Sequence, residues 1–311
     1  MKTIKKFLSI FICLALMLGF VFSGCAPKED SSSGGGDNGK EYSNEVQVVV
    51  LLGQSNAEGH TFSEYLEKTV GEAKTAEYRE GYENVKISYN CSFTNNNEGT
   101  YDRVMLGQGG NESKFGPEIG IAEKISALDP VKPVYIIKFA YGGTTLAGRW
   151  RSPSSKNTGN LYTSGLEFIL YQCRILEERD LYPVIKAICW MQGESDASGN
   201  SYNSYKKLEE NFVNDLRKDL AFYKDPSSEI GFIDAGISDC HAWTNYKIVN
   251  QAKKELAESS NSHVYIDTIA ENLKYNGEPA GSPDSYHYDS DSMIKLGHLF
   301  GDLLIANFLE V

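Results

Sequence analysis

The sequence lacks the positive charge that a nucleic-acid or anionic-surface partner would need. It contains 30 lysines and arginines against 42 aspartates and glutamates, which gives a formal net charge of −12. Residues 1–24 carry three lysines and no acidic residue, so removing them changes the charge to −15. Because such a chain repels phosphate groups, we expect no nucleic-acid partner.

The sequence also lacks cysteines at a spacing typical of a metal site. Four cysteines follow residue 44, namely Cys91, Cys173, Cys189 and Cys240. Cys189 lies inside an apolar run, which favours a buried thiol. An oxidising compartment would permit a Cys91–Cys240 disulfide, but the spacing does not decide whether it forms.

The beginning of the chain has the pattern of a secretory signal. Lys2, Lys5 and Lys6 precede an apolar run that is too short to be a typical membrane span, 7–22, which ends in Ser23-Gly24-Cys25. This ending resembles the lipobox of bacterial lipoproteins, with Phe22 where leucine is more usual. An ordinary signal peptide is the alternative.

The segment after Cys25 has the composition of a tether. Residues 31–39 contain only Ser, Gly, Asp and Asn and no apolar side chain. We therefore expect a lipoprotein signal peptide at 1–24, a flexible tether at 25–44 and a folded domain at 45–311. Lipidated Cys25 would anchor a monomer to the outer face of a bacterial cell membrane.

Short apolar runs alternate with amphipathic stretches throughout the folded part. Strands are expected at 46–52, 85–89, 133–140, 184–190 and 229–235, with a short one at 263–267. Helices are expected at 116–128, 166–178, 202–223, 246–258 and 292–308. This alternation predicts an α/β fold, a three-layer α/β/α sandwich around a central five-stranded, mainly parallel sheet. The common order 2-1-3-4-5 is expected, with the long polar segment 94–113 forming one wall of a cleft.

A serine follows the first strand directly, in the stretch Gly53-Gln54-Ser55-Asn56-Ala57. The nucleophile elbow of α/β-hydrolases needs a glycine two residues on either side of its serine, and here Ala57 replaces the second one. A different serine-hydrolase arrangement is therefore required.

Four features lie just beyond strand ends, on what should be one edge of the sheet. They are Ser55, the pair Gly142-Gly143, Gln192, and the late motif Asp284-Ser285-Tyr286-His287. Each alone has an ordinary explanation, such as a helix cap, a turn or a solvated loop. Together they fit acyl transfer, because a serine needs a base, the base needs an orienting carboxylate, and the oxyanion needs donors.

Several motifs resemble the SGNH (GDSL-like) hydrolase superfamily and, within it, the sialate O-acetylesterase-like branch that includes family 6 carbohydrate esterases. The resemblance covers about 46–304 and rests on these segments: Gly53-Gln54-Ser55-Asn56, Phe115-Gly116-Pro117-Glu118, Gly142-Gly143-Thr144-Thr145-Leu146, Trp190-Met191-Gln192-Gly193-Glu194-Ser195-Asp196 and Asp284-x-x-His287. The wider superfamily has Asn where this chain has Gln192, and the branch shares that Gln.

The resemblance implies a flavodoxin-like serine esterase that removes O-acetyl groups from carbohydrate, acetylxylan or a related acetylated polysaccharide or oligosaccharide, without metal or cofactor. Ser55 resembles the nucleophile, His287 the base and Asp284 its orienting partner. The backbone N–H groups of Ser55 and Gly143 and the amide of Gln192 would form the oxyanion hole. A sialate O-acetylesterase, a non-catalytic surface carbohydrate-binding protein and a lipid or thioester hydrolase are the alternatives.

Other polar and aromatic residues near these motifs are candidates for substrate contacts. They are Gln54, Asn56, Trp150, Glu194, His241 and Trp243, and His60 is a further candidate for the cleft wall. Trp150 and Trp243 lie in loops beyond strands, where a flat ring can meet a sugar face, so either is a candidate platform. Glu194 and Asp196 also permit a two-carboxylate glycosidase, but that mechanism would leave Ser55 and His287 unused.

Overall fold

The computed structural model describes residues 44–128 and 130–311. The expected signal peptide, Cys25 and residues 26–43 of the tether lie outside the described residues. The central strand β1, Glu45–Gly53, has both faces covered by apolar side chains. Val48 and Val50 pack into one hydrophobic cluster, whereas Val49 and Leu51 pack into a second cluster on the other face. This two-sided burial explains why residues 48–52 are apolar throughout and do not alternate with polar ones.

The main sheet has eight strands in the described part of the chain, ordered β10-β9-β8-β1-β7-β3-β4, with β5 also paired to β3. Six strands run parallel, and β4 and β5 pair antiparallel with β3. The bounds of the strands other than β1 are Tyr82–Cys91 (β3), Asn95–Asn96 (β4), Asp102–Val104 (β5), Val134–Ala140 (β7), Tyr182–Met191 (β8), Gly231–Ala235 (β9) and His263–Ile266 (β10). A separate pair joins β2, Thr61–Phe62, to β6, Lys114–Phe115.

The expected strand order 2-1-3-4-5 and the five-strand count are wrong. Counted along the chain, the long parallel strands lie in the order 2-3-1-4-5, and β10 adds a sixth parallel strand. The first strand does border the third, as expected, but on its other side it borders the fourth. β7 is almost wholly buried, whereas β3 exposes Glu83 and Asn84, so β3 lies nearer the edge of the sheet.

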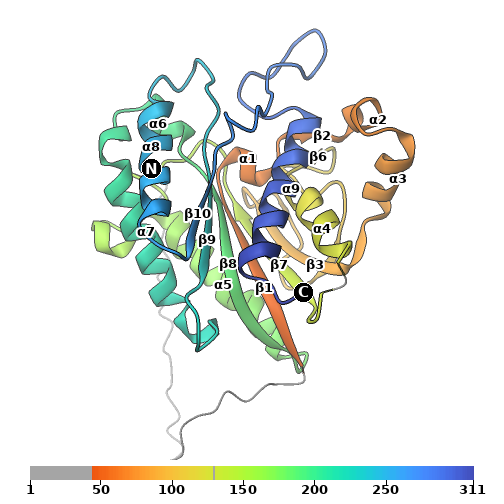
Figure 1. Ribbon diagram of the computed structural model, residues 1–311, viewed down its shortest axis with the longest axis vertical. Helices are drawn as coiled ribbons and strands as arrows, with labels where there is room; N and C mark the ends of the chain where they lie inside the picture. Colours follow the sequence, from red (N-terminus) through yellow and green to blue (C-terminus); the bar gives the residue numbers. More distant parts are fainter. Residues whose placement is uncertain (1–43, 129) are drawn as a thin grey trace, which may run out of the picture. The chain divides into compact units, whose positions relative to one another are not determined.

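Helices cover both faces of this sheet (Figure 1). One face packs against α5, α7 and α8, and the other against α4 and α9, which confirms the three-layer α/β/α arrangement. The helix bounds are Ser55–Glu58 (α1), Leu66–Thr69 (α2), Glu72–Glu80 (α3), Glu118–Ser126 (α4), Asn160–Glu177 (α5), Glu194–Ser198 (α6), Tyr205–Asp219 (α7), Tyr246–Glu258 (α8) and Ser290–Asn307 (α9). Helix α8 has the expected bounds, whereas α5 begins six residues before its expected start and α3 was not expected.

A buried ion pair fixes the long segment 94–113 against the sheet. Lys138 of β7 and Glu118 of α4 are both fully buried, and the Lys138 Nζ lies 2.8 Å from Glu118 Oε2. The same ammonium group donates to the Gln108 carbonyl at 2.8 Å. Burial disfavours the charged ammonium, but the nearby anionic groups outweigh it and raise the pKa of Lys138. The pair therefore holds the polar segment in place beside the carboxyl ends of the strands.

The four cysteines of the described part are buried free thiols, so no disulfide joins Cys91 to Cys240. Burial raises the pKa of the Cys189 thiol, as expected for a cysteine in the apolar core. No helix within 44–128 and 130–311 has the length and apolar character to cross a bilayer.

Candidate active site

Ser55 stands where β1 ends and the short helix α1 begins. Gly53 has a positive φ of 149°, and a Cβ at this position would collide with the carbonyl of Met191 on the adjacent strand β8. The Gln54 N–H donates to that same carbonyl at 2.8 Å. The close approach of the two strands requires glycine, and the chain then turns so that Ser55 lies at the carboxyl edge of the sheet.

A cavity of about 670 Å³ opens at this edge, and seven of the expected residues line it. These seven are Gln54, Ser55, His60, Gly143, Glu194, Trp243 and His287. Thr94 and Gly110 of the long polar segment also line the cavity, which confirms that this segment contributes a wall.

The Asp-x-x-His motif forms the expected pair. His287 Nδ1 donates to Asp284 Oδ2 at 2.6 Å, and Asp284 Oδ1 accepts the Tyr286 N–H at 2.8 Å. Burial opposes ionisation of Asp284, but the hydrogen bonds from His287 and from the Tyr286 N–H outweigh it and lower the pKa of that carboxyl. Burial lowers the pKa of His287, which keeps the imidazole neutral and able to accept a proton.

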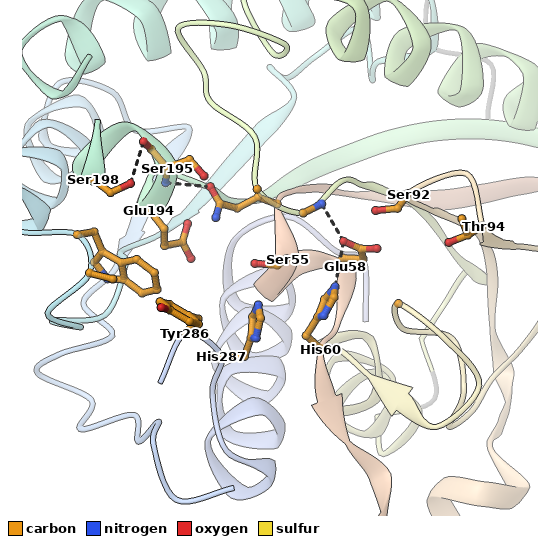
Figure 2. A pocket seen from close by; sticks show the side chains of 16 residues that line it. Ser55, Glu58, His60, Ser92, Thr94, Glu194, Ser195, Ser198, Tyr286 and His287 are labelled. Carbon is orange, nitrogen blue, oxygen red and sulfur yellow. Dashed lines mark hydrogen bonds and ion pairs between the residues drawn. The ribbon is translucent and has the colours of Figure 1, made fainter. Parts of the chain in front are cut away.

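Ser55 and His287 face the same cavity, and Figure 2 shows the His287 ring beside the Ser55 side chain. No hydrogen bond joins their side chains within the described residues. Two contacts instead tie the chain after Ser55 to the residue after His287: Tyr288 donates its N–H to Asn56 Oδ1 at 3.3 Å, and Thr61 Oγ1 donates to the Tyr288 carbonyl at 2.8 Å. Catalytic hydrogen bonds often shorten only when substrate binds.

The two glycines of the Gly142-Gly143 pair differ in whether the backbone N–H is already hydrogen-bonded. The Gly142 N–H donates to Glu58 Oε2 at 2.8 Å and is therefore already used. Gly143 has a positive φ of 65° and lines the cavity, and its N–H makes no hydrogen bond within the described part of the chain. This geometry favours Gly143 over Gly142 as an oxyanion donor.

Gln192 does not reach the cavity, which corrects its expected placement. Its side chain is fully buried, and its Nε2 donates to Asp196 Oδ2 at 2.7 Å and to the Thr144 carbonyl at 3.0 Å. Its Oε1 accepts the Tyr205 hydroxyl at 3.1 Å. With both amide hydrogens engaged, Gln192 holds the strand-end loops together and has no hydrogen free for an oxyanion.

Gln54 presents the amide that faces the cavity instead. Its Oε1 accepts hydrogen bonds from Gln192 Nε2 at 3.2 Å and from the Ser195 N–H at 3.4 Å. These contacts orient the side chain, and its Nε2 has no partner among residues 44–128 and 130–311. The residue immediately before Ser55 is therefore better placed than Gln192 to donate to a substrate oxygen.

Three other expected substrate contacts are also misplaced. Asn56 is 2% exposed, and both atoms of its amide are engaged, because Nδ2 donates to Glu194 Oε1 at 2.9 Å and Oδ1 accepts the Tyr288 N–H. Trp150 is 1% exposed, packs edge-to-face on Trp190 at 5.4 Å and donates its Nε1–H to a threonine hydroxyl, so it belongs to the core. His241 is exposed but does not line the cavity.

Glu194 lines the cavity with one oxygen unpaired. Its Oε2 is buried without a hydrogen-bond partner, and burial raises the pKa of this carboxyl. Figure 2 shows the carboxyl group turned toward the space beside Ser55. Asp196, the other carboxylate of the glycosidase alternative, does not line the cavity and accepts the backbone N–H groups of Leu146 and Ala147. The two-carboxylate mechanism therefore has no support.

The sequence motifs did not single out Glu58. It lines the cavity, and its Oε2 lies 3.2 Å from His60 Nε2. The His60 ring stacks on the His287 ring with centroids 4.7 Å apart and planes 20° apart, and Lys114 Nζ lies 3.2 Å from His60 Nδ1. The ammonium of Lys114 can only donate, so His60 accepts at Nδ1. Glu58 lies close to Ser55 in the sequence, and this proximity was the available signal that Glu58 belongs to the site.

A family model described as carbohydrate esterase, sialic acid-specific acetylesterase, matches residues 45–306. The fold resembles a protein of Arabidopsis thaliana, with 19% identity over 84% of this chain and 98% of that one, at a TM-score of 0.57. It also resembles NanS, with 15% identity, coverage of 85% and 97%, and a TM-score of 0.57. A carbohydrate acetylesterase from Xanthomonas citri has 13% identity over 84% of this chain and 56% of its own, at a TM-score of 0.52.

No curated protein matches the chain at a significant level. The structural likenesses support the fold, and the family model covers most of the described residues. The chain is therefore an SGNH-type esterase and belongs to the carbohydrate esterase family of sialic acid-specific acetylesterases.

Proposed function

We propose that the protein removes O-acetyl groups from a neutral carbohydrate, such as acetylxylan or a related acetylated oligosaccharide, through an acyl-enzyme on Ser55. The observation that carries this proposal is the convergence on one cavity of Ser55, the His287–Asp284 pair and the unpaired Gly143 N–H.

In the first step, Ser55 Oγ attacks the acetyl carbonyl while His287 Nε2 takes the hydroxyl proton. The carbonyl oxygen becomes an oxyanion, for which the N–H groups of Ser55 and Gly143 are the proposed donors, with the Gln54 amide close by. Collapse of this intermediate breaks the ester bond, and His287 returns the proton to the departing sugar oxygen. Water then attacks the acetyl-serine by the same route and releases acetate.

The charges around the cavity favour a neutral sugar over a sialic acid. Among residues 44–128 and 130–311, those that line the cavity include no lysine or arginine but include the carboxyl groups of Glu58 and Glu194. An Arg or Lys is the usual partner for the carboxylate of an acidic sugar, and here such a ligand would meet acidic groups instead. The family description keeps sialate as the second candidate.

Acetate release from three substrates tests the proposal: acetylated xylan, acetylated mannan and O-acetyl sialic acid. We expect release from at least one neutral polysaccharide and little from the sialic acid. Preference for the sialic acid would reassign the substrate. Binding without any release would favour the carbohydrate-binding alternative, and a preference for long acyl chains would favour a lipid or thioester hydrolase.

We also propose that lipidated Cys25 anchors the protein to the outer face of the membrane. The small residues Ser23-Gly24 before the cysteine and the polar tether after it support this proposal. Cys25→Ala should release the protein from the membrane fraction. Unchanged fractionation of this variant would contradict the anchor.

A further inference from the structure

Aromatic side chains line one end of the cavity, and a second aromatic surface lies next in the chain to residues that line the other end. At one end, the rings of Trp243 and Tyr286 are 5.9 Å apart and both residues line the cavity. At the other end, Phe93 stands between Ser92 and Thr94, which both line the cavity. Figure 2 shows Tyr286 and the pair Ser92 and Thr94 at opposite ends, with Ser55 between them.

Tyr286 is placed for contact with a ligand and not for packing. Its side chain is 52% exposed, although it lies between Asp284 and His287 in the sequence. Its hydroxyl has no hydrogen-bond partner within the described ranges. Trp243 beneath it is 6% exposed, and its Nε1–H donates to the Ser238 carbonyl at 2.7 Å, which fixes the ring. A fixed ring supporting an exposed phenol makes an amphipathic surface suited to a sugar.

Phe93 is held exposed by an unusual backbone. Phe93 has a positive φ of 61° and is 48% exposed, and Ser92 before it has a positive φ of 51°. A bulky residue rarely adopts this conformation, and such outliers concentrate at functional sites. The Phe93 N–H donates to Asn90 Oδ1 at 3.0 Å, and the ring packs against Tyr141 with centroids 5.6 Å apart.

The surface behind Phe93 continues as a stacked layer. The Arg149 guanidinium lies 4.0 Å from the centroid of the Tyr141 ring, and Tyr141 directly precedes Gly142-Gly143. The aromatic surface at this end is thus attached to the loop that carries the proposed oxyanion donor Gly143.

We propose that these two surfaces, Trp243–Tyr286 and Phe93–Tyr141, are sugar-binding subsites on either side of the reaction centre, so that the enzyme takes an acetylated sugar chain across Ser55. This inference rests on the proposed function. A chain of neutral sugars suits the occupant because both surfaces are aromatic and no lysine or arginine lines the cavity between them in the described part of the chain. Arg149 beside the second surface is already engaged, since it stacks on Tyr141 and donates to Asn160 Oδ1 at 3.2 Å. A free monosaccharide would occupy one surface at most.

The test compares Tyr286→Ala and Phe93→Ala with wild type on acetylated xylo-oligosaccharides of increasing length and on a small aryl acetate. We expect KM for the longer oligosaccharides to rise about 5- to 30-fold in each variant, with the aryl acetate within about twofold. Tyr286→Phe and Phe93→Tyr keep the rings and should restore most of the affinity. Phe222→Ala, which removes a 79% exposed ring whose chain neighbours do not line the cavity, is the control.

Two failures can be told apart. If wild type releases acetate from oligosaccharides but KM is independent of chain length and of both substitutions, the subsites are overturned and the esterase function stands. Equal losses on the aryl acetate and the oligosaccharides would also overturn the subsites, because the rings would then be structural. If wild type hydrolyses the aryl acetate but no carbohydrate, the proposed function fails and the subsites fail with it.

Discussion

Asp284→Asn replaces a carboxylate by an amide of nearly the same shape, yet it should impair the enzyme substantially. Asp284 accepts two hydrogen bonds with two oxygens, from His287 Nδ1 at 2.6 Å and from the Tyr286 N–H at 2.8 Å. Asparagine has only one oxygen. If that oxygen serves the Tyr286 N–H, the amide donates to His287 Nδ1 and forces the ring proton onto Nε2, which removes the base. If the oxygen serves His287, two N–H donors face each other near Tyr286.

The cost of this conflict sets the magnitude. Leaving one partly buried donor unsatisfied costs about 1–3 kcal/mol. Since about 1.36 kcal/mol is tenfold in rate, kcat/KM for acetate release should fall about 5- to 150-fold. Asp284→Ala imposes no wrong tautomer, so it should be no worse than the isosteric Asn variant. Both rates are measured with an aryl acetate, and Asp302→Asn on the surface of α9 serves as the matched control.

The pH profile adds an independent readout. Burial lowers the pKa of His287, and the hydrogen bond and charge of Asp284 act in the raising direction. The acid limb of the wild-type kcat/KM profile should therefore lie below about 6.5, the reference value for histidine. Asp284→Asn removes the raising influence and should move that limb to still lower pH. Near-normal activity with an unmoved acid limb would refute the assigned role of Asp284.

Three further predictions follow from the site and its support. Ser55→Ala and His287→Ala should each abolish most acetate release, and the double variant should be scarcely worse, because the two residues act as one unit; additive losses would contradict the unit. Gln54→Ala should lower kcat about 10²–10³-fold if its amide serves the oxyanion. Gln192→Ala should mainly lower the melting temperature. A large loss of kcat in Gln192→Ala with little loss in Gln54→Ala would restore Gln192 as the donor. Lys138→Ala should destabilise the fold by about 3–5 kcal/mol in denaturant unfolding, because its buried carboxylate partner is left unpaired; a loss below about 1 kcal/mol would show that the carboxyl group takes up a proton instead.

The residues nearest the chemistry could be predicted because their positions follow from strand ends. Ser55 and Gly143 stand where a buried apolar run stops and a polar or glycine residue follows, and parallel strands bring such points to one edge, whereas His287 lies in the loop directly before α9. The Asp284–His287 contact is local, since three residues separate the partners within one turn. Local spacing and strand polarity were sufficient for this part of the site.

The misplaced residues depend on packing between distant segments. Trp150 is flanked by Arg149 and Arg151, so its sequence neighbourhood resembles an exposed loop, yet its ring packs on Trp190. The direction of the Gln192 side chain is set by Asp196 and by the Thr144 carbonyl of another loop. Hydrophobic pattern does not encode these contacts.

The strand order escaped prediction for a related reason. The two candidate orders differ only in that β1 and β7 exchange places, and both of these strands are rich in buried apolar residues. The single lysine of β7, Lys138, does not discriminate between the orders, because β7 is an interior strand in both and Lys138 is buried in an ion pair with Glu118 of α4. From sequence alone, a lysine argues for an exposed strand.

The covalent intermediate tests the central claim most directly. The enzyme is mixed with excess aryl acetate, quenched rapidly in acid, and its intact mass and peptide map are measured. The proposed mechanism predicts a single acetyl group on the peptide that contains Ser55, with an initial burst of the aryl alcohol, and neither signal in Ser55→Ala. An acetyl group on another residue, or undiminished acetate release by Ser55→Ala, would contradict it.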